Sequence, residues 1–150
     1  MSSPSDRFEC HWRASAWLRL ASVGAHLLAL AACVLLDVPV GFKLLAVLAC
    51  CLHAAWTMPR QVALSHPEAM TGLRRDRGGW QLFSARRGWQ AVQLRGDSVA
   101  LPGLVILRFR RAGQWFSRSV CIPGDALPRE EHRRLRLRLK FSRRRWAPVR

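Results

Sequence analysis

The chain has few acidic residues and none of the short motifs that mark the common enzyme classes. Only 9 of its 150 residues are Asp or Glu, against 25 Lys or Arg. It contains no glycine-rich phosphate loop, no HExxH sequence and no GxSxG sequence. Asp97 and Ser98 fit a turn, and Asp125 fits the start of a helix. The sequence therefore predicts a protein that is not an enzyme.

The five cysteines predict neither a disulfide framework nor a metal site. Cys33, Cys50 and Cys51 lie in apolar runs, where cysteine behaves as a small hydrophobic residue. Cys10 and Cys121 have no partners at metal-ligand spacing. We therefore expect no metal and no cofactor, and the pattern fits a reducing compartment.

Two long apolar runs fill residues 14–57. The runs cover residues 14–36 and 40–56, and Pro39 ends the first of them. A helix that spans a bilayer core about 30 Å thick needs roughly 17–25 mostly apolar residues. A secretory signal would have a shorter apolar core, and a buried pair in a soluble protein would need covering helices. The pattern favours a transmembrane helical hairpin over these two alternatives.

The distribution of positive charge predicts the orientation of this hairpin. Arg7 and Arg13 precede it, Arg60 and the arginines of residues 74–77 follow it, and its turn carries Asp37. Lys and Arg near the ends of membrane helices stay in the cytoplasm. We therefore expect a multi-pass membrane protein with both termini cytoplasmic.

Three polar side chains within the apolar runs are candidate intramembrane sites, because such residues are costly in lipid. Arg19 and His53 fall at similar depth in an antiparallel hairpin and are expected to share a polar patch. His26 falls near the midplane. We expect a neutral His26 that bonds across the hairpin or to a second copy in a homo-oligomer, with a proton relay as the alternative.

The remaining residues predict an α+β membrane protein, in which a small antiparallel meander and a C-terminal helix follow the hairpin. Residues 1–13 form a cytoplasmic lead whose Phe8 and Trp12 are expected at the membrane interface. Residues 58–78 form a juxtamembrane connector. Period-two alternation from residue 79 predicts four or five strands, with a loop at residues 110–114 and a strand at 115–122. A helix that Asp125 caps completes the 79–141 domain, and a basic tail covers residues 142–150.

The C-terminal helix carries the strongest signal outside the apolar runs. We select five of its basic residues as candidate interaction residues: Arg133, Arg134, Arg136, Arg138 and Lys140. Such charge suits the phospholipid bilayer, an acidic protein or nucleic acid. Trp115 and Phe116 would be available for base stacking, but their strand pattern predicts that they lie in the core. Nucleic acid is therefore the least favoured partner, and a solvated face is expected for His132.

The order of these features resembles the YgfX (CptA) family of bacterial inner-membrane proteins. The resemblance rests on the opening Phe8-x-x-x-Trp12-Arg13-x-Ser15 and the hairpin after it, followed by Gly79-Trp80, Trp89, the 95–98 turn, the 104–109 strand and the arginine-rich helix. The basic end at residues 142–150 departs from the family pattern. The resemblance implies the toxin component of a proposed toxin–antitoxin pair, with no catalytic residues.

The same resemblance implies partners. Family members are described as disturbing the cytoskeletal proteins FtsZ and MreB, and they are encoded beside a small soluble protein, SdhE (CptB), that is linked to flavin attachment. We therefore expect an inner-membrane protein that acts by protein–protein interaction, inhibits cytoskeletal polymerisation and is modulated by an SdhE-like partner. The alternatives are a factor for maturation of a flavoprotein such as succinate dehydrogenase, or a basic domain that binds lipid or nucleic acid.

Overall fold

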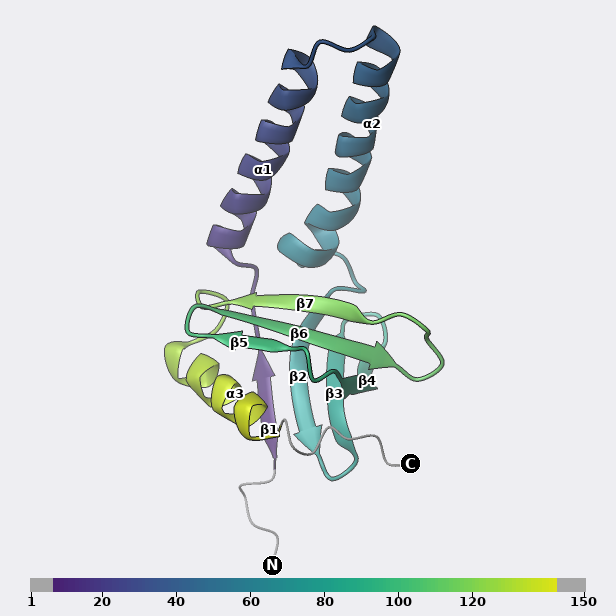
Figure 1. Cartoon of the computed structure of the whole chain (residues 1–150). Coiled ribbons are helices and arrows are strands. Elements are labelled where there is room, and N and C mark those ends of the chain that lie inside the picture. Colours follow the sequence, from purple (N-terminus) through teal and green to yellow (C-terminus); the bar gives the residue numbers. More distant parts are fainter. Residues whose placement is uncertain (1–6, 143–150) are drawn as a thin grey trace, which may run out of the picture.

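The computed structural model describes residues 7–142, which form a helical hairpin standing on a domain made of one sheet and one helix (Figure 1). The elements in chain order are β1 (Phe8–His11), α1 (Ala16–Leu35), α2 (Val40–Thr57), the π-helix η2 (Met58–Val62), β2 (Met70–Asp76), β3 (Gly79–Ser84), β4 (Gly88–Leu94), β5 (Val99–Leu101), β6 (Leu104–Arg111), β7 (Arg118–Pro123) and α3 (Arg129–Ser142). This order confirms the predicted hairpin, meander and terminal helix.

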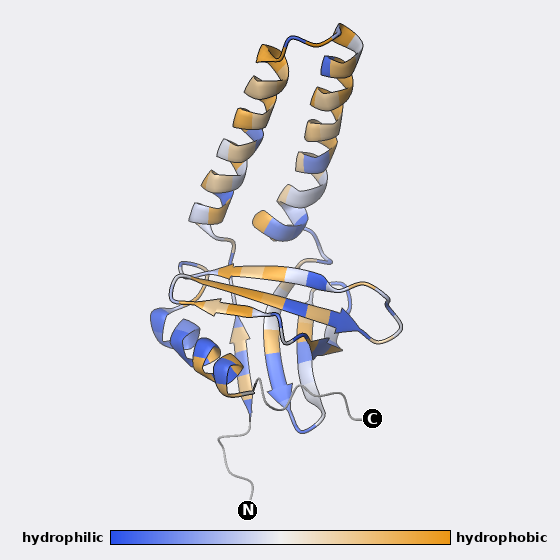
Figure 2. Ribbon diagram, viewed as in Figure 1, coloured by the Kyte–Doolittle hydropathy of each residue, from blue (hydrophilic) through white to orange (hydrophobic). Residues whose placement is uncertain are grey.

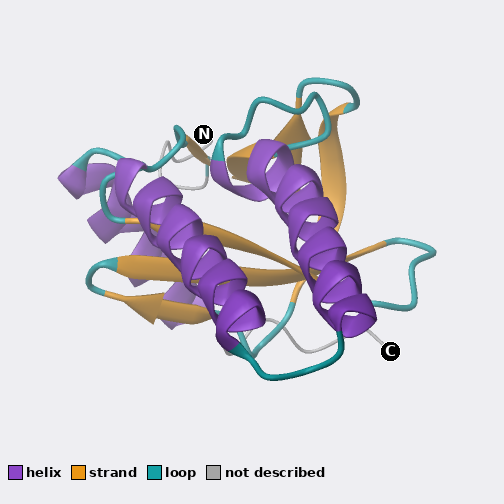
Figure 3. Cartoon of the chain, turned by 90° about the horizontal axis from the view of Figure 1, so that it is seen from above, coloured by secondary structure: helices purple, strands orange, loops and turns teal. Residues whose placement is uncertain are grey.

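Helices α1 and α2 are long and apolar enough to cross a membrane. Neither helix has a buried residue, and many of their large apolar side chains are exposed. Figure 2 shows hydrophobic residues along most of the length of both helices. Seen from above, the two helices lie side by side over the domain, which does not enclose them (Figure 3). A soluble protein would bury such helices, so the alternative of a buried helical pair does not fit this fold.

The sheet has seven antiparallel strands and β6 is its centre. Its path runs β1-β2-β3-β4-β6-β5, and β7 also pairs with β6. Strands β4 and β5 share one edge of β6, where Leu94 pairs with Phe109 and Val99 pairs with Ile106. The other edge pairs with β7 from Leu104 to Phe109. Because one strand joins three others, the sheet curls around the side chains on its inner face.

The sheet is larger than the sequence predicted, because it includes parts of the predicted lead and connector. Strand β1 lies within residues 1–13 and pairs with β2, which lies within residues 58–78. Phe8 and Trp12 are 8% and 4% exposed in the core, so their predicted place at the membrane interface was wrong. Phe8, Cys10 and Trp12 alternate with polar neighbours, which is the period-two pattern of a half-buried strand.

The predicted strand at residues 115–122 begins too early. Strand β6 continues to Arg111 and β7 starts at Arg118, so residues 112–117 form the loop between them. Trp115 is 92% exposed and Phe116 is 66% exposed, which makes the prediction that they lie in the core wrong.

The domain core lies between the concave face of the sheet and α3. Its fully buried side chains include Leu73, Leu107, Phe109 and Leu135. Leu135 and Leu139 lie one helical turn apart and present the apolar stripe of α3 to the sheet. Helix α3 begins at Arg129, later than predicted, and residues 143–150 of the predicted basic tail lie outside the described residues.

Truncation of Leu107 tests this account of the core. Leu107 is 0% exposed at the centre of β6, so Leu107→Ala should lower the free energy of unfolding by about 2–5 kcal/mol. Unfolding of the purified protein in detergent, followed by tryptophan fluorescence, measures the loss. Val99→Ala, at a position 39% exposed on β5, should cost less than about 1 kcal/mol. Equal losses for the two variants would contradict the assigned core.

Candidate functional site

The first link between hairpin and domain is a hydrogen-bonded cap on α1. Ser15 Oγ accepts a hydrogen bond from the Leu18 N–H at 3.0 Å and donates one to Asp125 Oδ1 at 2.6 Å. The Trp17 N–H donates to Asp125 Oδ2 at 3.4 Å. The negative carboxylate thus lies at the positive end of the helix dipole. Asp125 was predicted to cap the C-terminal helix, and the structure shows that it supports the first membrane helix instead.

The electrostatics of Asp125 reflect this role. Burial raises the pKa of its carboxyl group, but the hydrogen bond from Ser15 and those from backbone N–H groups outweigh burial, so the pKa is lowered overall. The carboxylate therefore keeps its charge at neutral pH. A backbone hydrogen bond from the Arg13 N–H to the Ala126 carbonyl, at 3.0 Å, fixes the same junction.

The second link follows α2. The π-helix η2 continues α2, and the Arg60 guanidinium lies 3.5 Å from the centre of the Trp56 ring. Leu64 then adopts a φ of 52°, a left-handed conformation that is uncommon for leucine. This bend sends the chain into β2. The hairpin is thus attached to the sheet at both of its ends.

Within the hairpin the structure brings two of the three candidate polar residues together. His26 Nε2 lies 3.2 Å from His53 Nδ1, and the two rings are stacked. His26 Nδ1 lies 2.7 Å from the Ser22 carbonyl oxygen, which only accepts. A neutral His26 therefore carries its proton on Nδ1 and accepts the His53 Nδ1–H on Nε2. Arg19 lies exposed on α1, and the residue in contact with His53 is His26.

The five candidate interaction residues of α3 do not form one patch. Arg133, Arg134 and Lys140 are exposed on the outer face of the helix. Arg136 and Arg138 lie at its two margins and are half-buried. The Arg138 guanidinium lies 5.2 Å from the centre of the Phe8 ring, so this residue helps to hold α3 against β1.

Two apolar side chains share the outer face with the exposed charges. Leu137 is 44% exposed and Phe141 is 76% exposed, and they lie one turn apart among Arg133, Arg134 and Lys140. Figure 2 shows hydrophobic residues interspersed among the mostly hydrophilic residues of α3. We call these five residues the outer face of α3. Sequence reasoning selected its charges and missed Leu137 and Phe141, although the 3.6-residue period places them on the same side.

A groove runs between α3 and the base of α1. It has a volume of about 650 Å³, and its lining includes Trp17, Asp125, Arg133, Arg136 and His132. His132 is 3% exposed, so the predicted solvated position was wrong. Burial lowers the pKa of His132 and nearby Arg136 lowers it further, against the effect of a backbone hydrogen bond to Ile122. This histidine is therefore neutral at neutral pH.

Residues 7–142 contain no group of three or more His, Cys, Asp or Glu side chains that could hold a metal ion. Burial raises the pKa of the Cys10 thiol to about 12, and the negative charges of Glu131 and Glu9 add to the effect. A protonated, buried thiol is a poor nucleophile.

The comparisons with known proteins point to one family. A family model described as the membrane-bound toxin component of a toxin–antitoxin system matches residues 6–143, which include both helices of the hairpin and the whole sheet. The chain matches no curated protein and no solved structure.

Replacing Asp125 tests the junction between hairpin and domain. Asp125→Asn should lower the free energy of unfolding by about 0.5–2 kcal/mol at neutral pH, because the cap loses its charge. The pKa of Asp125 is lower in the folded protein than in the unfolded chain. The ionised carboxylate therefore stabilises the fold fully above its pKa in the unfolded chain, and this contribution is lost as the pH falls through its pKa in the folded protein. Unfolding measured between about pH 6 and pH 3 should show a smaller acid-induced loss for the variant than for the native chain.

Asp37→Asn, in the turn at the other end of the hairpin, provides the matched control. It removes the same charge and should leave the acid-induced loss as in the native chain. If both variants shift the pH profile equally, the effect comes from net charge and not from the cap.

Proposed function

We propose that this chain, which belongs to the family of membrane-bound toxin components of toxin–antitoxin systems, acts by protein–protein contact through the outer face of α3. Family membership implies an antitoxin partner and association with a membrane. Beyond family membership, we assign the outer face of α3 as the binding surface, protein–protein contact as the mode of action, and the cytoplasm as the location of the domain.

The observation that carries the proposal is the composition of the outer face of α3. Exposed Leu137 and Phe141 lie among three exposed cations. Protein interfaces are typically centred on apolar or aromatic anchors, and arginine is enriched around them. An apolar pair ringed by positive charge suits a partner with a hydrophobic groove and an acidic rim.

The hairpin would hold this surface close to the bacterial inner membrane. Trp17 and Trp56 are exposed at its base, where aromatic rings prefer the membrane interface. Arg13 and Arg60 lie at the same end, and Asp37 lies in the turn at the other end. This distribution supports a membrane-spanning hairpin with both termini and the domain in the cytoplasm. Helix α3 would then lie below the headgroups, beside the base of α1 (Figure 1).

The family resemblance supplies candidate partners. We take FtsZ and MreB as targets and a small SdhE-like protein as the modulator. Binding of polymer subunits to a membrane-held domain would limit their assembly without any chemical step. The protein would therefore act as a binding protein and not as an enzyme. Contacts of this kind weaken as salt screens the charges.

Charge reversal on the outer face of α3 tests the proposal. The full-length protein, reconstituted in nanodiscs, should reduce the sedimentable fraction of purified FtsZ or MreB under polymerising conditions. Arg133→Glu/Arg134→Glu should restore polymerisation and weaken target binding about tenfold or more, because two attractions become repulsions. Overexpression of the same variant should no longer alter cell shape.

Arg95→Glu/Arg110→Glu is the matched control, because it makes the same change in net charge at two exposed positions of the domain outside α3. This control should inhibit as the native protein does. Equal loss in both variants would mean that the interaction depends on overall charge. Normal polymerisation with the native protein, together with reduced flavin loading of succinate dehydrogenase after deletion, would favour the maturation role instead.

A further inference from the structure

Two cavities adjoin at the junction of hairpin and sheet and share Arg118 and Glu68 in their linings. The larger has a volume of about 950 Å³ and the smaller about 80 Å³. They lie on the side of the domain that faces the hairpin, at a distance from the outer face of α3. Nothing in the proposed function uses them.

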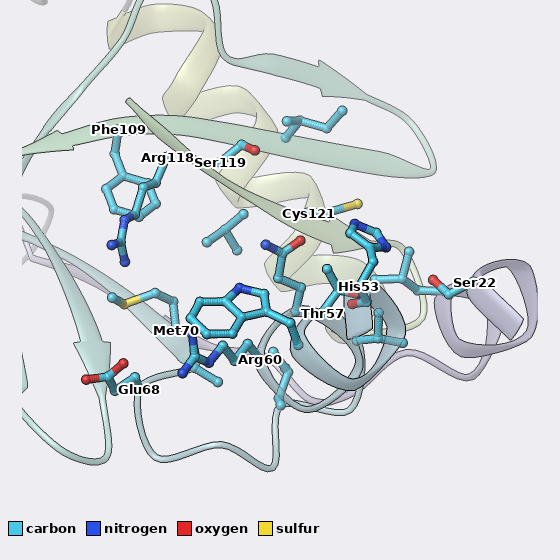
Figure 4. Close-up of a pocket in the computed structure, with 18 of the residues that line it drawn as sticks. Ser22, His53, Thr57, Arg60, Glu68, Met70, Phe109, Arg118, Ser119 and Cys121 are labelled. Carbon is cyan, nitrogen blue, oxygen red and sulfur yellow. The ribbon is translucent and has the colours of Figure 1, made fainter. Parts of the chain in front are cut away.

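The larger cavity extends from the apolar helices to the sheet. At one end it is lined by Leu18, Ser22 and His26 of α1 together with His53 of α2. From Leu18 to His26 the helix rises about 12 Å, so this end lies well inside the apolar part of the hairpin. Figure 4 shows Ser22 and His53 at one side of the cavity and Arg118 and Glu68 at the other.

The wall between these ends is mixed, and Thr57, Arg60, Gln61 and Ser119 add polar groups to it. Its apolar part comes from Trp56, Met70, Ile106 and Val120, on the hairpin, β2, β6 and β7. Such a surface, open toward the lipid-facing helices, suits a hydrocarbon chain.

The smaller cavity is an arginine cluster. Arg87, Arg111 and Arg118 come from the β3–β4 turn, the end of β6 and the start of β7, and Glu68 is the acidic residue among the lining residues. Glu68 already forms an ion pair with Arg86 at 2.9 Å and lies 4.0 Å from Arg87. Among residues 7–142, no ion pair joins Arg111 or Arg118 to a carboxylate. The cluster therefore has an excess of positive charge.

Two buried polar atoms in this cluster have no hydrogen-bond partner. They are Arg111 Nε, a donor, and Gln114 Oε1, an acceptor. Burial lowers the pKa of Arg111, and the charges of Arg118 and Arg87 lower it further. An anion would relieve this repulsion. A phosphate oxygen would accept from Arg111, and a hydroxyl or ammonium group attached to that phosphate would donate to Gln114.

We propose that the two cavities together form a binding site for one anionic phospholipid. The phosphate of the lipid lies against Arg118 and Arg111, and one acyl chain lies in the larger cavity between the base of the hairpin and β7. The positive charge of the arginine cluster favours an anionic headgroup. The apolar wall that reaches into the hairpin favours a ligand with an acyl chain over a soluble phosphate compound. A bound lipid would join β7, β2 and both membrane helices.

Native mass spectrometry of the full-length protein in detergent tests this site, with phosphatidylglycerol as the probe. The native chain should retain phosphatidylglycerol in preference to phosphatidylcholine with the same acyl chains. Arg118→Gln should weaken phosphatidylglycerol binding about tenfold, since one charge-assisted contact is lost. Arg118 is exposed on an edge strand, so the variant should fold, and its unfolding temperature verifies this.

Arg95→Gln, which removes the same charge from the exposed loop between β4 and β5, is the matched control and should bind lipid as the native chain does. Ser119→Trp fills the larger cavity without changing its charge and should also weaken lipid binding. Equal retention by the native chain, Arg118→Gln and Arg95→Gln would overturn the site. Displacement of the lipid by glycerol phosphate or inorganic phosphate at equal concentration would overturn the lipid assignment and indicate a soluble phosphate ligand.

Discussion

The structure depends on one constraint: the apolar hairpin is inserted between two strands that pair with each other. Strand β1 ends just before α1, and β2 begins soon after η2, yet Cys10 pairs with Leu73 and Phe8 pairs with Arg75. The hairpin therefore takes the place that a short turn occupies in an ordinary β-hairpin. The domain cannot swing on a single tether, because both ends of the hairpin are fixed in neighbouring positions of one sheet.

The contact between Ser15 and Asp125 adds a third point of attachment, from the loop that connects β7 to α3. It places the start of α3 beside the base of α1, and Trp17 and Arg133 line the same groove. Helix α3 thus has a defined position relative to the hairpin, as do β7 and the arginine cluster at its start. A protein bound at α3 and a lipid bound at β7 would both contact the same sheet.

The sequence was sufficient to predict the hairpin, the strands from residue 79 and the terminal helix, because each has a strong local period. It was not sufficient for β1, a strand of four residues whose Phe8 and Trp12 suit a membrane interface equally well. Strand β1 pairs with β2 across the whole hairpin, and the sequence of neither segment shows which strand it pairs with. Trp115 and Phe116 misled for the opposite reason: their strand-like pattern continues into β7, but after the turn at residues 112–113 the loop runs on to residue 117 and β7 begins only at Arg118. Non-local structure limited the prediction of the sites in the same way. The charges of α3 are adjacent in the sequence and could be predicted. Arg87, Arg111 and Arg118 come together from three separate strand ends, which the sequence does not show.

The insertion between β1 and β2 also bears on assembly. Folding of the two helices against each other brings these strands together and offsets part of the entropy cost of closing so long a loop. In a bilayer that step is insertion of the hairpin. A chain whose hairpin stayed outside the lipid would leave β2 as an unpaired edge and Phe8 and Trp12 without their core, which are features that proteases and chaperones recognise. Completion of the sheet is thus linked to folding of the hairpin.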